Sequence, residues 1–229
     1  MPDSLALSPG LAPVSPPVLS PRIALVDLHD PAFAKHVVAR LISDGMRVAV
    51  IGDPVPGAEM DFPRSIRPTA AELTAVVARI ERELGSLDVL VCAADTPPRG
   101  GFASTPATEW FAGVSQALFG PFALIRAAVS ALSRTEDARI IIVGSGWTAA
   151  ELDDSTATAA VQGALVALVK TLARDLGPRG ITVNEVSVPL DTTAGPRALA
   201  AAVGYLNGPV SGAVTGQIVT VGSGGDIRP

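Results

Sequence analysis

The sequence predicts a single α/β domain built around a doubly wound parallel sheet with helices on both faces. Its apolar runs are short, rich in β-branched residues and free of polar alternation, which is typical of strands buried on both faces. Between these runs, apolar residues recur at helix-face spacing. Because crossovers between parallel strands are right-handed, this alternation places helices on both sides of the sheet. A length of 229 residues suits one such domain, and no second domain or internal repeat is visible.

Six strands and five helices alternate along the predicted domain. We expect strands at 22–26, 47–51, 88–92, 139–143, 181–184 and 216–221. We expect helices at 31–45, 69–84, 108–131, 155–176 and 197–206. Gly45 ends the first helix, a capping box of Thr69 and Glu72 begins the second, and Gly177-Pro178 ends the fourth. The Pro/Gly-rich segment that follows the second strand leaves little room for a crossover helix and a third strand, since a parallel crossover normally needs about a dozen residues.

Composition narrows the classes of partner. Hydrophobic residues make up 48% of the chain and charged residues 17%, so we expect a partner to cover part of the apolar surface. A formal charge of −5 without a basic run argues against nucleic acid and membrane as partners. No apolar run reaches the length of a membrane span, and no secretory signal is visible. The only cysteine, Cys92, excludes an internal disulfide and fits a reducing compartment, so we expect a cytoplasmic protein.

Residues 1–21 form a compositional unit apart from the domain at 22–229. They include six prolines, several serines and no basic residue, a composition typical of an extended or disordered tail. We favour a solvated extension. Apolar residues in the tail leave open a second interpretation, in which it straps onto a neighbouring subunit.

A known family's catalytic elements can be followed through the chain. Segment 158–184, TAAVQGALVALVKTLARDLGPRGITVN, resembles the helix and strand that carry Tyr-x-x-x-Lys in short-chain dehydrogenases/reductases. Thr158 stands at the tyrosine position, Gln162 at the lysine position and Ala117 at that of the family's helix asparagine. Ser145 keeps the catalytic serine, thirteen residues before Thr158. The resemblance covers 22–224 and implies a Rossmann-like fold.

The catalytic positions are therefore not intact. A threonine hydroxyl ionises far above a phenol and reaches less far, so Thr158 cannot serve as the family's general acid/base. Gln162 carries no charge that could lower a neighbour's pKa. We interpret Thr158 and Gln162 as ordinary polar residues of a helix surface, and Ser145 as a retained turn residue.

The cofactor-binding positions are changed as well. Where the family has T-G-x-x-x-G-x-G, the glycine positions hold Leu28, Ala32 and Ala34; where it has N-N-A-G, the last position holds Asp95. Glycine lets a pyrophosphate approach the helix N-terminus without a Cβ in the way. Asp27 and Asp30 would add negative charge there. We therefore expect no cofactor, and NAD(P) only if the chain is an oxidoreductase with an atypical site.

Two other polar features have simpler interpretations than a site. His29 with Asp27 and Asp30 suggests a metal site, but we favour a solvated loop and expect no metal. Cys92 is expected to be a small core residue, and Trp147 to fill the vacated active-site cleft.

The elements that resemble the family's oligomer interface persist. The helices near 110–131 and 156–176 keep apolar faces, and 215–224 resembles a segment that helps form tetramers in many members. After Pro189 the chain leads almost at once into the closing helix, so the substrate lid is expected to be deleted. We interpret the chain as a catalytically inactive subunit that pairs with an active paralogue in a hetero-oligomer. Two alternatives stay open: a homo-oligomeric small-molecule-binding module, and an NAD(P)-dependent oxidoreductase with an atypical active site.

Overall fold

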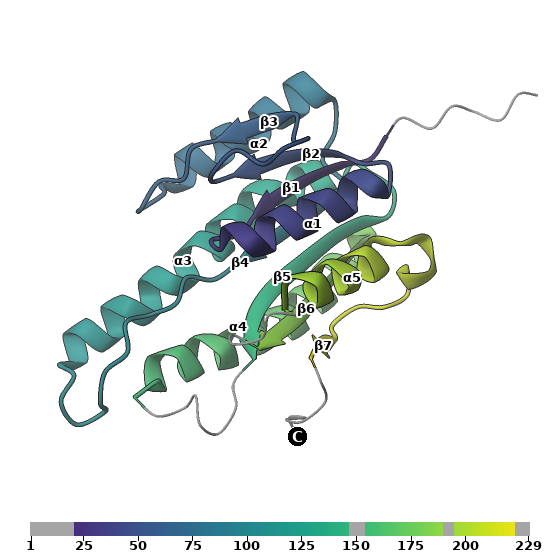
Figure 1. Cartoon of the computed structure of the whole chain (residues 1–229). Helices are drawn as coiled ribbons and strands as arrows, with labels where there is room; N and C mark the ends of the chain where they lie inside the picture. Colours follow the sequence, from purple (N-terminus) through teal and green to yellow (C-terminus); the bar gives the residue numbers. More distant parts are fainter. Residues whose placement is uncertain (1–20, 147–153, 190–194, 223–229) are drawn as a thin grey trace, which may run out of the picture.

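The computed structural model describes residues 21–146, 154–189 and 195–222. Seven parallel strands form one sheet, and Figure 1 shows how the helices and strands are arranged. The strand order is β3-β2-β1-β4-β5-β6-β7. The strands are β1 (Ile23–Asp27), β2 (Arg47–Ile51), β3 (Met60–Phe62), β4 (Val89–Ala93), β5 (Ala138–Gly146), β6 (Ile181–Pro189) and β7 (Ile218–Thr220). This order, which turns back between β1 and β4, confirms the predicted doubly wound sheet. The predictions for the tail, Trp147 and the lid concern residues outside the described ranges.

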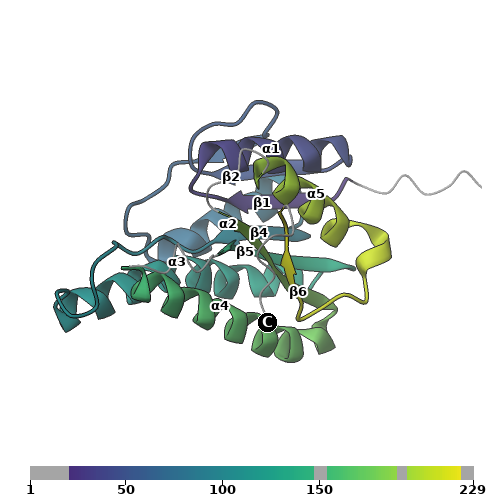
Figure 2. The same cartoon turned by 60° about the horizontal axis from the view of Figure 1, so that its bottom comes forward.

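Helices cover both faces of the sheet, as Figure 2 shows. The helix α1 (Pro31–Ser43) packs beside α5 (Gly195–Asn207) on one face. The helices α2 (Ala70–Leu84), α3 (Ala107–Leu132) and α4 (Thr156–Leu176) lie side by side on the other. Short 3₁₀ turns follow α4 and α5, at Gly177–Arg179 and Pro209–Ser211.

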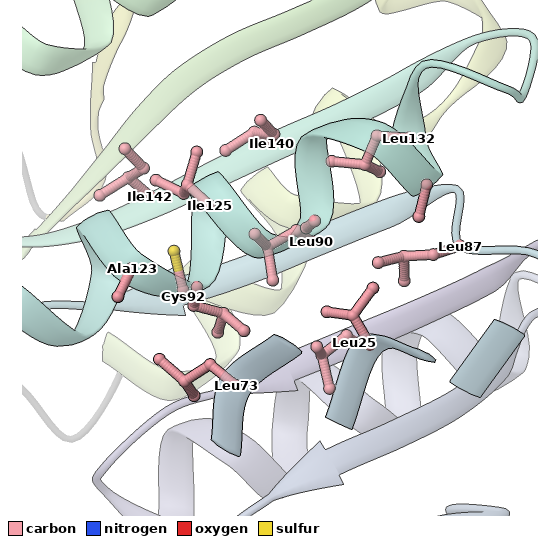
Figure 3. Packing of buried hydrophobic residues seen from close by; sticks show 14 of the residues in the cluster. Leu25, Leu73, Leu87, Leu90, Cys92, Ala123, Ile125, Leu132, Ile140 and Ile142 are labelled. Carbon is pink, nitrogen blue, oxygen red and sulfur yellow. The ribbon is translucent and has the colours of Figure 1, made fainter. Parts of the chain in front are cut away.

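Each face of the sheet has its own hydrophobic core, because successive strand side chains point to opposite sides. On the α2 and α3 side, Leu25, Leu90 and Ile140 pack with residues such as Leu73 and Ile125 (Figure 3). The alternate strand residues, among them Val26, Val91 and Ile141, pack against α1 and α5 on the other side. Burial on both faces explains why the strands read as unbroken apolar runs.

The strand β3 is the main correction to the predicted elements. It pairs in parallel with β2 through Ala49↔Met60, although the loop 52–59 contains no helix. Gly52 and Gly57 have positive φ angles of 136° and 89°, so the loop can turn back within a few residues. The region is shortened, as the sequence indicates, but it still supplies the sheet's edge strand.

The helix boundaries agree closely with the sequence pattern. Thr69 and Glu72 form the predicted reciprocal capping box at the start of α2. Gly45 follows the end of α1 with a φ of 82°. The strand β6 is longer than expected, because it pairs with β5 from Ala138↔Ile181 through Gly146↔Pro189.

The helices α3 and α4 contradict the expectation that no apolar segment reaches membrane-span length. By length and composition alone each could cross a membrane, a test that the core helices of soluble proteins also pass. Both pack on the sheet and on each other, and Trp110 Nε1 of α3 donates to Thr156 Oγ1 of α4 at 3.0 Å. Only 33% of the apolar window in α3 and 28% in α4 is buried within the chain. Most residues of these two windows are therefore exposed or only partly buried within the chain.

Candidate functional site

The carboxyl ends of β1, β2 and β4 border a cavity at the point where the strand order reverses. Ligands of open α/β sheets bind at this switch point. The cavity has a volume of about 810 Å³ and is bounded by α2, α3 and the loops that follow β3 and β4. Asp27, His29, Arg64 and Asp95 are among its polar lining residues, while most of its lining surface is apolar.

An ion pair between Asp27 and Arg64 joins the ends of β1 and β2. Arg64 Nη2 lies 2.6 Å from Asp27 Oδ1 and donates to the carbonyl of Ile51 at 2.9 Å. Burial raises the pKa of the Asp27 carboxyl, while Arg64 and His29 act against this rise. The prediction of a solvated loop is thus wrong for Asp27. Its carboxylate is buried, because the positive charge of Arg64 offsets the cost of removing it from water. Sequence reasoning missed Arg64, since nothing in its Pro/Gly-rich surroundings indicates which strand end it reaches.

Asp30 occupies the N-terminus of α1. Its Oδ1 accepts from the backbone N–H groups of Ala32 at 2.7 Å and Phe33 at 3.3 Å, as expected of an N-cap aspartate. These are donors that a pyrophosphate would use in a dinucleotide-binding fold. A carboxylate of the chain therefore already holds the position where a phosphate would be favoured.

Two of the three changed glycine positions lie in the core next to this cap. Leu28 is buried among residues of the α1-side core, and Ala34 is buried on α1 itself. Ala32 is exposed on the first turn of α1. Together with the Asp30 cap, these residues do not fit a pyrophosphate.

His29 pairs across the cavity rim with Asp95, the residue that stands at the end of the family's N-N-A-G motif. The His29 Nδ1 and Asp95 Oδ1 atoms are 2.8 Å apart. This hydrogen bond lowers the pKa of the Asp95 carboxyl. Within the described residues no three His, Cys, Asp or Glu side chains are grouped to hold a metal ion.

Ala117 reaches the same rim through its backbone. Pro121 has no N–H, so the usual helical donor to the Ala117 carbonyl is missing. The backbone N–H of Asp95 approaches that carbonyl at 3.3 Å instead. Ala117, which stands at the position of the family's asparagine, thus holds the loop after β4 through its main chain. Its methyl side chain is buried.

Two of the catalytic positions, Ser145 and Gln162, meet between β5 and α4. Gln162 is only 5% exposed, and its Oε1 accepts from the backbone N–H of Ser145 at 3.1 Å. The interpretation of Gln162 as helix-surface polarity is therefore wrong; it is a buried residue that binds the end of β5. Thr158 lies one turn earlier on α4 and is half-buried.

Glu185 on β6 is a buried acidic residue that the sequence reasoning missed. It is fully buried, and its carboxylate lies against Gly144 on the neighbouring strand. A Cβ at position 144 would overlap Glu185 and lie 2.8 Å from Gln162 Oε1. The signal available in the sequence was a lone acidic residue within the apolar strand ITVNEVSVP.

The buried thiol of Cys92 is at the end of β4. Burial and then the charge of Asp27 raise the pKa of Cys92 well above its usual range. This thiol is part of the core of the α2 and α3 side, as expected from the sequence.

The fold and the site define a doubly wound α/β protein of the dinucleotide-binding architecture, and the comparisons with known proteins agree. A family profile described as enoyl-(acyl carrier protein) reductase matches residues 68–195. The chain therefore belongs to the short-chain dehydrogenase/reductase family.

Individual relatives are distant. The chain is 30% identical over 166 residues to 2,3-dihydro-2,3-dihydroxybenzoate dehydrogenase of Bacillus subtilis, covering 72% of this chain and 59% of that protein. It is 26% identical over 177 residues to the 3-oxoacyl-[acyl-carrier-protein] reductase FabG of Escherichia coli, covering 67% of this chain and 72% of that protein. A solved short-chain dehydrogenase/reductase from Serratia marcescens superposes with a TM-score of 0.75 at 27% identity, covering 87% of this chain and 95% of the other.

Proposed function

We propose that this chain is a non-catalytic member of its family that acts as a structural or regulatory subunit beside an active paralogue. One observation carries the proposal: groups of the chain itself occupy both halves of the family's site. Asp30 takes the N-terminal donors of α1, and Gln162 binds the end of β5 where a lysine would act on the cofactor. Thr158, which stands at the position of the family's tyrosine, cannot transfer a proton in its place.

The surface proposed to meet the partner is the outer face of α3. Phe111, Phe119 and Phe122 are 64%, 45% and 49% exposed. At about 100° per residue, the three rings fall within an arc of about 80° on the helix. Fully burying a phenylalanine contributes about 1.5–3 kcal/mol, so this face can stabilise a helix-to-helix contact.

The first experiment measures the mass of the native complex purified from its source, and then of complexes co-expressed with each paralogue. We expect a second polypeptide in the complex. Phe122→Glu should weaken the complex, whereas Tyr205→Glu, at a ring 50% exposed on α5, should leave it intact. A stable homo-oligomer that ignores every paralogue would overturn the proposal.

The alternative of an atypical oxidoreductase has its own test. The names of the relatives, a dehydrogenase and a reductase, favour it. Calorimetric titration with NADH and NADPH should show no binding at micromolar concentrations if the Asp30 cap excludes the pyrophosphate. Micromolar affinity for either dinucleotide would favour the oxidoreductase instead.

The cavity supports a second candidate function, binding of a small molecule that lacks a phosphate. Its volume of about 810 Å³ lies in the usual range for ligand sites, and its lining is mainly apolar. A thermal-shift screen would detect a ligand, because binding to the native state raises the apparent stability. Ala112→Phe, which narrows the cavity from α3, should remove the shift, and Ala78→Phe, on an exposed part of α2 outside the cavity, should not.

A further inference from the structure

The charged groups around the cavity of about 810 Å³ are not balanced. Four carboxylates line it, against two guanidinium groups and one imidazole. The carboxylates belong to Asp27, Glu72, Asp95 and Glu109, and the guanidinium groups to Arg64 and Arg79. With a neutral imidazole the lining therefore has an excess of negative charge. Which of these charges a ligand can use depends on what each side chain already contacts.

Both guanidinium groups are already paired. Arg64 Nη2 lies 2.6 Å from Asp27 Oδ1. Arg79 Nε lies 2.8 Å from Glu83 Oε1, and the guanidinium carbon of Arg79 is 5.4 Å from the centre of the Phe62 ring. Because Glu83 does not line the cavity, it offsets the charge of Arg79 and leaves the carboxylates of the lining in excess. The lining therefore favours a cation over an anion.

Two of the four carboxylates are open to a ligand. The Glu72 side chain is not one of them, because it accepts from the backbone and the hydroxyl of Thr69 in the capping box. The Asp95 side chain is 48% exposed, and its contact with His29 uses only Oδ1. Glu109 is exposed in the first turn of α3, and among the described residues none forms an ion pair with it. Asp95 and Glu109 thus present negative charge that a ligand can reach.

Asp95 is the better placed of these two carboxylates. Its side chain is held by His29 Nδ1 at 2.8 Å, and its backbone N–H approaches the Ala117 carbonyl at 3.3 Å. The hydrogen bond from His29 also lowers the pKa of the Asp95 carboxyl, so this group stays ionised at neutral pH. Glu109 precedes Ala117 by eight residues, which is about 12 Å along α3. A cation at Asp95 would therefore feel Glu109 from a distance, without touching it.

The wall beside Asp95 suits the apolar part of a ligand. The helix α3 contributes Ala112 and Gly113 to the lining, and α2 contributes Leu73 and Val76. Most of the lining surface is apolar, as in sites where a few polar groups orient a mainly apolar ligand.

We propose that the cavity binds a small organic cation, an amine carried on an apolar body, whose ammonium group donates to the Asp95 carboxylate. The inference rests on the small-molecule-binding function proposed above and names the class of its ligand. The apolar body lies against α2 and α3, and Glu109 adds attraction from the outer part of the cavity.

The test is thermal unfolding of the full chain with three probes that share one aromatic body: 2-phenylethylamine, 2-phenylethanol and 3-phenylpropanoate. At neutral pH their end groups are positive, uncharged and negative. We expect a saturable rise in Tm with the amine at a concentration about tenfold lower than with the alcohol, and no rise with the carboxylate at equal ionic strength.

Variants locate the response. Asp95→Asn keeps an oxygen that can accept from His29 but removes the charge, and should reduce the preference for the amine to about twofold or less. Glu109→Gln should reduce it by a smaller factor. Glu136→Gln, at an exposed glutamate near the opposite end of the sheet, should leave it unchanged. Ala112→Phe, which narrows the cavity, should remove the response to the amine.

The outcomes separate this inference from the function on which it rests. Equal responses to the amine and the alcohol would overturn the amine assignment and leave a small-molecule site standing. No response to any of the three probes, or an amine response that survives both Asp95→Asn and Ala112→Phe, would also overturn the assignment. If Asp95→Asn does not fold, the wild type decides: its preference for the amine should shrink as sodium chloride rises from about 0.05 M to about 0.5 M, and a preference that does not change would overturn the assignment.

Discussion

Replacing Arg64 with methionine isolates the energetic role of the buried Asp27. The substitution keeps an unbranched apolar stem but removes the cation that lies 2.6 Å from the carboxylate. Breaking a fully buried ion pair costs about 3–5 kcal/mol, because one charge is left in a poorly solvated place. Arg64 is 28% exposed and Asp27 9%, so solvent reaches part of the pair. We therefore expect a loss of about 2–3 kcal/mol at pH 7, below the range for a fully buried pair.

The loss of unfolding free energy caused by Arg64→Met should become smaller as the pH falls. Burial raises the pKa of Asp27 in the native state, and the charge of Asp95 adds to this rise while Arg64 and His29 oppose it. Between about pH 4, where an unfolded aspartate titrates, and the raised native value, the native state binds more protons than the unfolded state. Stability from this group therefore falls as pH rises through that window. Arg64→Met removes a charge that opposes the rise, so the native pKa of Asp27 increases further and the window becomes wider. Acidification should therefore recover part of the lost stability.

Urea unfolding followed by circular dichroism at pH 5 and pH 7 measures both effects. Arg67→Met, at an exposed arginine three residues on, is the matched control and should change the free energy of unfolding by less than about 0.5 kcal/mol. The double variant Asp27→Leu with Arg64→Met should recover most of the loss, because no charge is left uncompensated. A loss for Arg64→Met no larger than that of the control, or one that grows on acidification, would refute the reasoning.

Four further experiments test other contacts. Asp30→Ala should destabilise the chain by about 0.5–2 kcal/mol in urea unfolding through loss of the α1 cap, and Asp30→Ser should restore most of it. Gly144→Ala should cost about 1–3 kcal/mol, because its Cβ would lie 2.8 Å from Gln162 Oε1, so an unchanged urea midpoint would contradict that packing. Cys92 should react with a thiol reagent at pH 8 only after unfolding, as its raised pKa and burial predict. Thr158→Tyr combined with Gln162→Lys should give no ketone reduction with NADPH, and measurable turnover would show that the Asp30 cap does not block the cofactor.

The sequence predicted the layers of the fold well, because they depend on local pattern. Unbroken β-branched runs identified the buried strands, and the capping box at Thr69 and Glu72 gave the start of α2 from two residues. The strand β3 was not predicted from the sequence. It has only three residues, Met60–Phe62, which are too few to show a strand pattern, and the loop before it lacks the expected crossover helix.

The site was harder to predict because its contacts join distant residues. Asp30 acts within its own turn, so a cap could be read from the chain. The partner of Asp27 is 37 positions further on, at Arg64, and the partner of Ser145 is on the next helix. Whether a polar residue on a helix is buried depends on what packs over it. The sequence alone does not show those neighbours, so Gln162 was predicted to lie on the helix surface although it is buried.

The proline in α3 connects two surfaces that otherwise have separate roles. Pro121 leaves the Ala117 carbonyl for the backbone of Asp95, a residue of the cavity rim, and Phe119 and Phe122 flank that same proline on the outer face. A shift of this helical turn on partner docking would move the rim, and a ligand pressing on the rim would move the turn. By thermodynamic linkage, any effect of a docked partner on the cavity's affinity is matched by an equal effect of the ligand on docking. Under the proposed function, the helical turn at Pro121 would thus link partner docking to the cavity.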